Sequence, residues 1–209
     1  MAPCVLHGPR SSACITRSIA ALEHARAHES MLKRKVILPR NYASLTRAEQ
    51  TFVVINLERV DRGIRPIVGM TARLNRQAKA GAVAAADPNP LISVLRQLGV
   101  RRYRTLWAQD YGALASDYEW MYDDGYAGAM TANITCRYAG APGCWGHRRA
   151  ILMRFRAFPL LLGGTAAAHA VGGADSLAVV LTGGHGRAPH FTYTWRNALR
   201  HGADGHRTR

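Results

Sequence analysis

The residues of this sequence best suited to chemistry are His147 and two aspartates that precede it, Asp110 and Asp123. An imidazole with a near-neutral pKa can act as a general base or bind a metal ion. Carboxylates supply the oxygen ligands that hard cations prefer. One histidine and two aspartates would form a weak, unselective metal set, which tolerates Mg²⁺ or Ca²⁺ better than Zn²⁺. His147 is therefore the candidate for both catalysis and metal binding, and the choice of Asp123 as its acidic partner comes from the resemblance given below.

A hydrolase would also need a nucleophile or a positioned water. Ser116 opens the pattern Ser116-Asp117-Tyr118-Glu119, which is typical of a helix-capping box, and no Gly-x-Ser-x-Gly motif is present. The competing interpretation of His147 is structural. Gly146 permits an unusual backbone dihedral angle just before it, and the ring would then bond a backbone carbonyl or Asp123. We favour the structural interpretation.

The four cysteines form two local pairs, Cys4 with Cys14 and Cys136 with Cys144. Neither pair has the C-x-x-C spacing typical of zinc sites. A disulfide between Cys136 and Cys144 would stabilise the fold by roughly 2.5 kcal/mol on the chain-entropy model, and disulfides favour an exported protein. The pairing of Cys4 and Cys14 stays open. We expect an extracellular or cell-envelope location, although the first residues lack the apolar core of a signal peptide.

The elements that must position these residues are mostly helices. Thr46-Arg47-Ala48-Glu49 is a capping box, and apolar residues at helical spacing follow it as far as Val60. The other predicted elements are helices over 71–86, 91–98 and 116–122, an extended piece over 101–108, and strands over 163–171 and 176–182. Gly172-Gly173-Ala174-Asp175 joins the two strands into a hairpin. The sequence therefore predicts an α+β fold with helices packed on a small antiparallel sheet.

The net charge of +15 is unevenly distributed. Residues 1–40 carry +5 and residues 184–209 carry +4, so the two ends hold most of the excess. We expect 1–40 to be a poorly ordered leader or linker, 41–183 to be the folded domain, and 184–209 to be a basic flexible tail. Nucleic-acid binding is disfavoured, because no aromatic-basic platform accompanies the charge. No apolar run approaches the roughly 20 residues of a membrane span.

Several stretches, taken in order, resemble the CAP superfamily, which covers cysteine-rich secretory proteins, antigen 5, plant pathogenesis-related proteins and bacterial SCP-like extracellular domains. The stretches are Val54-Ile55-Asn56-Leu57-Glu58-Arg59, Gly63-Ile64-Arg65-Pro66-Ile67, Leu74 with Ala78, Trp120, and Gly146-His147-Arg148-Arg149-Ala150-Ile151-Leu152. They are similar to the bacterial pattern of an Asn and an Arg late in the first helix, a Gly-x-x-Pro connector, and a Gly-His-Arg-x-x-Ile-Leu signature. The resemblance covers about 46–183 and implies an α-β-α sandwich.

The resemblance also implies a cavity that can carry two histidines and two acidic residues. His147 matches the second histidine, and Asp123, three residues after the tryptophan, matches the second acid. The first acid falls near Gln109 and Asp110, and the first histidine has no counterpart in Ala86-Asp87-Pro88-Asn89-Pro90. The set is thus depleted, and the stretch 125–143 is an insertion relative to the usual bacterial form.

These observations lead to one main hypothesis and one alternative. The main hypothesis is a bacterial, non-catalytic extracellular binding module with a degenerate His/acid cleft and no cofactor, whose ligand is a lipid, a cell-envelope component or a protein. The cleft would be lined by Trp107, Gln109, Asp110, Trp120, Asp123, Trp145 and His147. The alternative is a metal-dependent hydrolase that uses His147 and Asp123 with a divalent metal. The oligomeric state stays open.

Overall fold

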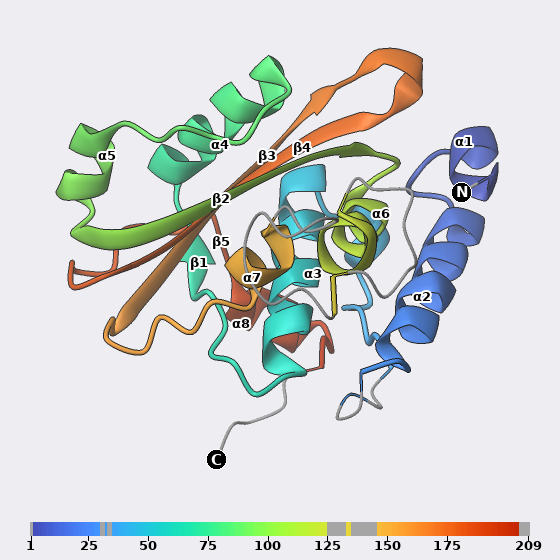
Figure 1. Ribbon diagram of the computed structural model, residues 1–209, viewed down its shortest axis with the longest axis horizontal. Helices are drawn as coiled ribbons and strands as arrows, with labels where there is room; N and C mark the ends of the chain where they lie inside the picture. Colours follow the sequence, from blue (N-terminus) through green and yellow to red (C-terminus); the bar gives the residue numbers. More distant parts are fainter. Residues whose placement is uncertain (1, 30–31, 33–34, 125–132, 135–145, 205–209) are drawn as a thin grey trace.

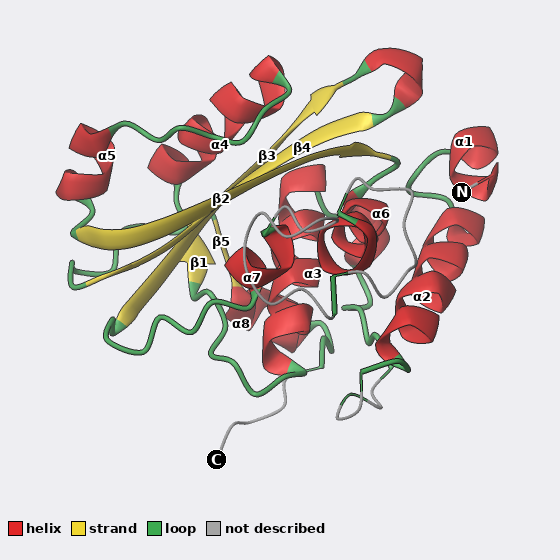
Figure 2. Cartoon of the chain, viewed as in Figure 1, coloured by secondary structure: helices red, strands yellow, loops and turns green. Residues whose placement is uncertain are grey.

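The centre of the molecule is a five-stranded mixed sheet with the strand order β2-β4-β3-β1-β5 (Figures 1 and 2). The computed structural model describes residues 2–29, 32, 35–124, 133–134 and 146–204. The strands are β1 (Gly69–Met70), β2 (Val100–Asp110), β3 (Leu160–His169), β4 (Asp175–Gly184) and β5 (Tyr193–Thr194). The three long strands pair antiparallel, and the predicted hairpin is confirmed as β3 and β4.

The sheet is not wholly antiparallel, because β1 runs parallel to β3. A parallel pair requires a long crossover connection, and residues 71–159 supply one here. Strand β1 has only two residues, which is too short for an alternating pattern of apolar residues to reveal it. The predicted α+β class with a small sheet is confirmed, and its strand arrangement is mixed.

Helices cover both faces of the sheet (Figure 2). The helical segments are α1 (Ala2–His7), α2 (Ser12–Arg26), η1 (Tyr42–Ser44), α3 (Arg47–Val60), α4 (Ala72–Ala84), α5 (Ile92–Gln97), α6 (Ala113–Tyr118), the π-helical turn η2 (Glu119–Asp123), α7 (His147–Ile151), η3 (Val171–Gly173) and α8 (Trp195–Arg200). Helix α4 packs on one face, and α3 packs on the other. Every residue of β4 is buried, as expected for a central strand covered on both sides.

Alternate residues of the long strands belong to two separate apolar cores. Val179 joins the larger core, which includes Phe52 of α3, whereas Val180 joins the smaller core with Leu74 of α4. Gly164 of β3 explains why α4 can lie so close to the sheet. A Cβ at that position would be only 2.2 Å from the backbone carbonyl carbon of Leu74, so any larger residue would push the helix away.

Helix α3 begins as the sequence predicts, with Thr46 and Glu49 forming a reciprocal capping box. Farther along it, the buried side chain of Asn56 accepts a hydrogen bond from the Ile67 N–H at 2.7 Å and donates one to the Ile67 carbonyl at 3.2 Å. Arg59 donates to the carbonyl of Arg65 at 2.9 Å. These two polar residues hold the connector between α3 and β1 in place.

The N-terminal segment differs from our expectation of a poorly ordered leader. Helix α2 places Leu22 and Ala25 in the larger core, and the buried Arg26 bonds Glu58 and, at 2.6 Å, Asp61 of the α3 region. The in-phase apolar residues Ile19, Leu22 and Ala25 indicate a helix here and pack on the larger core, whereas the buried ion pairs of Arg26 are long-range contacts that periodicity does not predict. The segment 1–40 is therefore part of the packed structure wherever it is described.

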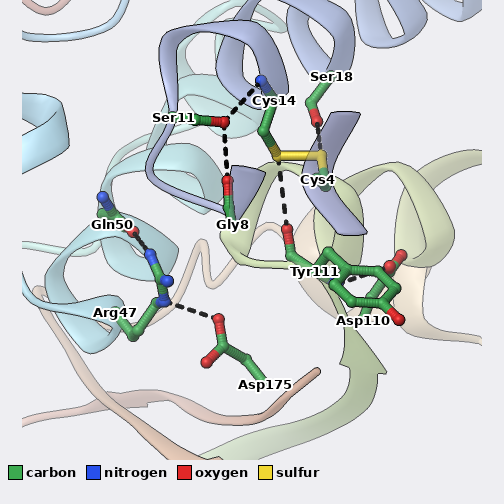
Figure 3. The surroundings of a disulfide bond; sticks show 10 residues. All are labelled: Cys4, Gly8, Ser11, Cys14, Ser18, Arg47, Gln50, Asp110, Tyr111 and Asp175. Atoms are coloured by element: carbon green, nitrogen blue, oxygen red, sulfur yellow. Dashed lines mark hydrogen bonds and ion pairs between the residues drawn. A yellow bond between two sulfur atoms is a disulfide. The ribbon is translucent and has the colours of Figure 1, made fainter. Parts of the chain in front are cut away.

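A disulfide between Cys4 and Cys14 joins α1 to α2 (Figure 3). Both cysteines are buried, and the Ser11 side chain caps α2 by accepting a hydrogen bond from the Cys14 N–H at 3.2 Å. The disulfide is compatible with an extracellular protein. Along the parts of the chain that the structure describes, no helix is both long and apolar enough to cross a membrane.

The C-terminal segment also differs from the flexible tail that we expected over 184–209. Tyr193 and Thr194 form β5, which pairs with β1 at the edge of the sheet. Thr194 then caps α8, and Trp195 and Ala198 of that helix belong to the larger core. This segment is rich in His, Gly and Arg, so it has no repeating apolar pattern from which the short, well-packed helix α8 could be predicted.

Candidate functional site

His147 is the first residue of helix α7, and both of its ring nitrogens face carboxylates. Nδ1 lies 2.5 Å from Oδ1 of Asp124, and Nε2 lies 3.5 Å from Oδ1 of Asp87. Gly146, the residue before the helix, has φ = +91°, in the left-handed region where glycine carries no steric penalty. This turn aims the imidazole between the two aspartates.

The two aspartates come from distant parts of the sequence. Asp124 follows the π-helical turn η2 and is itself left-handed, with φ = +44°, a conformation that aspartate tolerates better than most residues. Its side chain is buried, whereas that of Asp87, in the loop after α4, is 54% exposed. Single π-helical turns occur often at functional sites, and this one positions the buried partner of His147.

The surroundings of His147 keep its ring positively charged at neutral pH. Burial alone would lower the pKa of the imidazole, but the hydrogen bonds and charges of Asp124 and Asp87 outweigh burial and raise the pKa to about 9. A doubly protonated ring also satisfies the geometry, because each nitrogen then donates to one carboxylate. His147 is therefore a fixed cation at pH 7 and is poorly suited to accept a proton as a general base.

Glu119, the first residue of η2, lies in the same acidic neighbourhood. Burial raises its pKa, and the charges of Asp110, Asp124 and Asp123 add to that effect, whereas His147 opposes it; the pKa reaches about 7. Burial likewise raises the pKa of Asp110, against the hydrogen bond that its carboxylate accepts from the Tyr111 N–H at 2.6 Å. The site thus combines a histidine cation with a carboxyl group that titrates near neutrality.

A groove of about 880 Å³ opens beside His147, between α7 and the edge strand β2. Its walls are formed by Asp87, Arg101, Arg102, Tyr103, Arg104, Thr105, Gly146, His147, Arg149, Ala150 and Met153. Among the described lining residues, four arginines outnumber the one aspartate, and the charge of His147 is compensated by Asp124 and Asp87. A groove of this size falls in the range of small-ligand sites, and its charge suits an anionic ligand.

Of the described cleft residues predicted from the sequence, His147 alone lines the groove. Trp120 is buried in the larger core, and its indole N–H donates to the backbone carbonyl of Trp107 at 2.9 Å. The Trp107 indole N–H bonds the hydroxyl of Ser176 at 2.9 Å, on the α4 side of β2. These tryptophans therefore fix β2 in position.

The remaining predicted residues have different outcomes. Gln109 is exposed near the end of β2, and Asp110 is partly buried at that end. Asp123 is partly buried in η2, but the carboxylate bonded to His147 is that of its neighbour, Asp124. The remaining predicted positions, Trp145 and the pair Cys136 and Cys144, lie outside the described residues.

The expectation that Ser116 caps a helix is wrong. Ser116 does not cap a helix, because α6 begins three residues earlier, after Gly112, and Ser116 is buried inside it. The Ser-x-x-Glu pattern there was misleading, since Glu119 belongs to η2. The sequence gives no signal for Asp87 as a partner of His147, because it lies in a stretch where the family resemblance points to a histidine. Asp123 and Asp124 are equivalent by sequence, since both lie at a helix end before Gly125, and the fold selects Asp124.

A buried network of charges holds α7 against the rest of the protein. Arg148 donates to the Met121 carbonyl at 3.1 Å and bonds Glu29 of the α2 region at 2.7 Å. Glu29 also bonds Arg62 at 2.6 Å and accepts a hydrogen bond from the Tyr122 hydroxyl at 2.7 Å. Burial opposes ionisation of Glu29, but its bonds to Arg62 and Arg148 win and lower its pKa to about 2. The network therefore stays ionised at neutral pH.

Within the described ranges, no three His, Cys, Asp or Glu side chains are grouped so that they could hold a metal ion. No protein-family model and no curated protein matches this chain in sequence. The function is therefore inferred from the arrangement of the described residues.

Proposed function

We propose that this protein is a non-catalytic binding module whose ligand site is the cationic groove between α7 and β2. The observation that carries the proposal is the double carboxylate contact of His147. An imidazole clamped by Asp124 and Asp87 is a cation at pH 7 whose charge is compensated by the two carboxylates, so it is poorly suited to serve as the base of a hydrolase. The four arginines among the described residues of the groove walls give the groove its preference for anions.

The resemblance to the CAP superfamily agrees with this proposal. The residues that carry it interact directly: Arg59 of α3 donates to the carbonyls of Ile151 and Met153 at the end of α7. Asp87 lies within 3.5 Å of His147, in the stretch where the family would place its first histidine. We interpret the site as a family cavity in which one imidazole is replaced by a carboxylate. An extracellular or cell-envelope location, suggested by the Cys4–Cys14 disulfide, fits such a module.

The test compares two variants with the same change of charge. Arg149→Glu reverses an exposed charge on the groove wall, and Arg200→Glu reverses an exposed charge on α8. Binding of the full-length protein to peptidoglycan sacculi, to phosphatidylglycerol vesicles and to inorganic polyphosphate is measured by co-sedimentation or anisotropy at low salt. We expect at least one probe to bind wild type and Arg200→Glu alike, with a loss of roughly tenfold or more for Arg149→Glu.

The alternative of a metal-dependent hydrolase makes opposite predictions. It requires a stoichiometric divalent metal in the purified protein that is lost in His147→Gln, together with ester or phosphodiester hydrolysis that is lost in the same variant. Either result would replace the binding proposal. Equal binding of every probe by Arg149→Glu and Arg200→Glu would remove the groove from the function.

A further inference from the structure

The free edge of β2 raises the question of what occupies the groove. Strand β2 is the outermost strand of the sheet, and β4 is its one strand partner among the described residues. Edge strands expose backbone N–H and C=O groups that can pair with another chain. The register of the sheet determines which residues of β2 direct their backbone N–H and C=O groups away from β4.

The register can be followed from β1 outward. The carbonyls of Leu161 and Gly163 accept hydrogen bonds from the chain at β1, so the residue between them, Leu162, directs its backbone groups toward β4. Leu162 lies opposite Thr182, which therefore faces back toward β3. Because successive residues of a strand alternate between its two neighbours, Leu181 directs its backbone groups toward β2.

Leu181 lies opposite Arg104, so Arg104 completes the ladder and its neighbours Tyr103 and Thr105 point their backbone groups away from β4. Side-chain contacts agree with this assignment. The Tyr103 carbonyl accepts a hydrogen bond from the Arg104 guanidinium at 2.9 Å. Two residues beyond Thr105, the Trp107 carbonyl accepts one from an indole outside the sheet. The backbone groups of Tyr103 and Thr105 thus face the groove, and an added strand would exchange the Arg104 guanidinium on the Tyr103 carbonyl for its own N–H.

The side chains along this edge select the partner by charge. Arg102 and Arg104 point to the same face of the strand, and their Cα atoms are about 6.8 Å apart at the usual rise of a strand. Alternate residues of any strand added beside β2 have the same spacing, so acidic residues at every second position would lie next to both arginines. His147 and Arg149 line the opposite wall, and Asp87, the one acid of the groove, already contacts His147.

Two other occupants fit less well. A second copy of β2 would place arginines against arginines, and like charges on neighbouring strands are destabilising. The parts of this chain that the structure does not describe contain no Asp or Glu, so they do not complement the charge. We propose that the groove binds an extended acidic peptide segment of another protein, which pairs with the backbone of Tyr103 and Thr105 as an added strand. This inference rests on the groove being the ligand site.

The test uses a fluorescent acidic hexapeptide, Glu-Val-Glu-Val-Glu-Thr with blocked ends, and its lysine counterpart. Tyr103→Pro removes one outward N–H without removing a ladder bond to β4, whereas Tyr103→Ala removes the same side chain and keeps the N–H. We expect the full-length protein to bind the acidic peptide, Tyr103→Ala to bind within about threefold of wild type, and Tyr103→Pro to bind at least roughly tenfold more weakly. A second test leaves the protein unaltered and uses two versions of the acidic peptide, one N-methylated at its odd residues and one at its even residues. One of the two versions should lose as much binding as Tyr103→Pro does.

Several outcomes would overturn the inference. Equal binding by Tyr103→Pro and Tyr103→Ala together with equal binding of both N-methylated peptides would show attraction by charge without strand pairing. A dimer through this edge, seen in sedimentation and abolished by Tyr103→Pro, would name a second copy as the occupant. Binding of polyphosphate or anionic vesicles through Arg149 with no binding of the peptide would reject the peptide and keep the proposed function. Failure of all probes would reject both.

Discussion

The charge of His147 makes stability depend on pH in a predictable way. The pKa of the ring is about 9 in the folded protein and about 6.5 in an unfolded chain. A histidine whose folded pKa is raised stabilises the protein fully below pH 6.5 and loses that contribution as pH rises through 9. A difference of 2.5 in pKa corresponds to about 3 kcal/mol, and the side chain is only 18% exposed, so little of this is lost to solvent screening.

The measurement is urea denaturation of wild type and His147→Gln at pH 6, 7.5 and 9.5. We expect wild type to lose about 3 kcal/mol more than the variant between pH 6 and pH 9.5. His169→Gln, which removes an exposed histidine of β3, controls for the loss of a histidine as such. NMR titration of ¹³C-labelled histidine, with His147→Gln to assign the resonance, gives the pKa directly, and Asp124→Asn should bring that pKa well below 9.

Glu119 provides a check in the neighbouring pH range. Its folded pKa of about 7 lies above the ordinary 4.5, so its contribution to stability is lost as pH rises from 4.5 to 7. Glu119→Gln should remove the loss of stability between pH 4.5 and pH 7 and leave the loss between pH 6.5 and pH 9 that His147 causes. If the His147 ring titrates near pH 6.5, or if wild type and His147→Gln lose stability in parallel above pH 6.5, the ring is not clamped as described and the argument against a general base fails.

Three further predictions concern the scaffold, and urea denaturation measures each. Arg26→Met should cost about 3–5 kcal/mol, because it leaves Asp61 buried without its cation and leaves Glu58 with Arg62 alone. Arg17→Met on the exposed side of α2 should change stability by less than about 0.5 kcal/mol, and equal effects would refute the buried network. Gly164→Ala should cost at least about 3 kcal/mol, because its Cβ would meet backbone atoms of Leu74. Gly163→Ala should cost less, because its Cβ would meet the movable Ile67 Cγ2 at 3.1 Å. The reverse order of the two costs would contradict the close packing of α4. The double variant Cys4→Ser/Cys14→Ser should lose roughly 2.5–3 kcal/mol under non-reducing conditions, and an unchanged midpoint would mean that the bond contributes nothing.

Local signals in the sequence predicted the central elements well. The Thr46 capping box, the hairpin of β3 and β4, and the helices α3, α4 and α5 all follow from patterns within a few residues. Patterns of that kind predict a structure when a segment buries an apolar face wide enough to repeat. The apolar spacing of Ile19, Leu22 and Ala25 indicates a helix in the region of α2, but not its packing on the core. That packing and strands β1 and β5 depend on a few long-range contacts, such as the ion pair between Arg26 and Glu58, which local patterns do not predict.

The candidate site shows the same limit. His147 was identified from its place in a glycine-preceded turn, and the structure places it on the groove wall. Its partners Asp87 and Asp124 were not identified, because they lie 60 and 23 residues away in sequence and meet only when α4, η2 and α7 have packed. The tryptophans were assigned to a cleft on the strength of their type, but an indole is also an excellent core residue when its N–H finds a carbonyl, as in Trp120.

The stretch Gly146-His147-Arg148-Arg149 explains how the five-residue helix α7 can form one wall of the groove. Five residues are too few for a stable helix in water, so α7 depends on what its side chains contact. Successive residues of a helix point about 100° apart, which sends His147 to the aspartates, Arg148 inward to Glu29, and Arg149 to the groove. Because Glu29 belongs to the α2 region, the disulfide-linked N-terminal helices support the groove wall that α7 forms. Damage to that region should therefore weaken the proposed binding in the groove as well as stability.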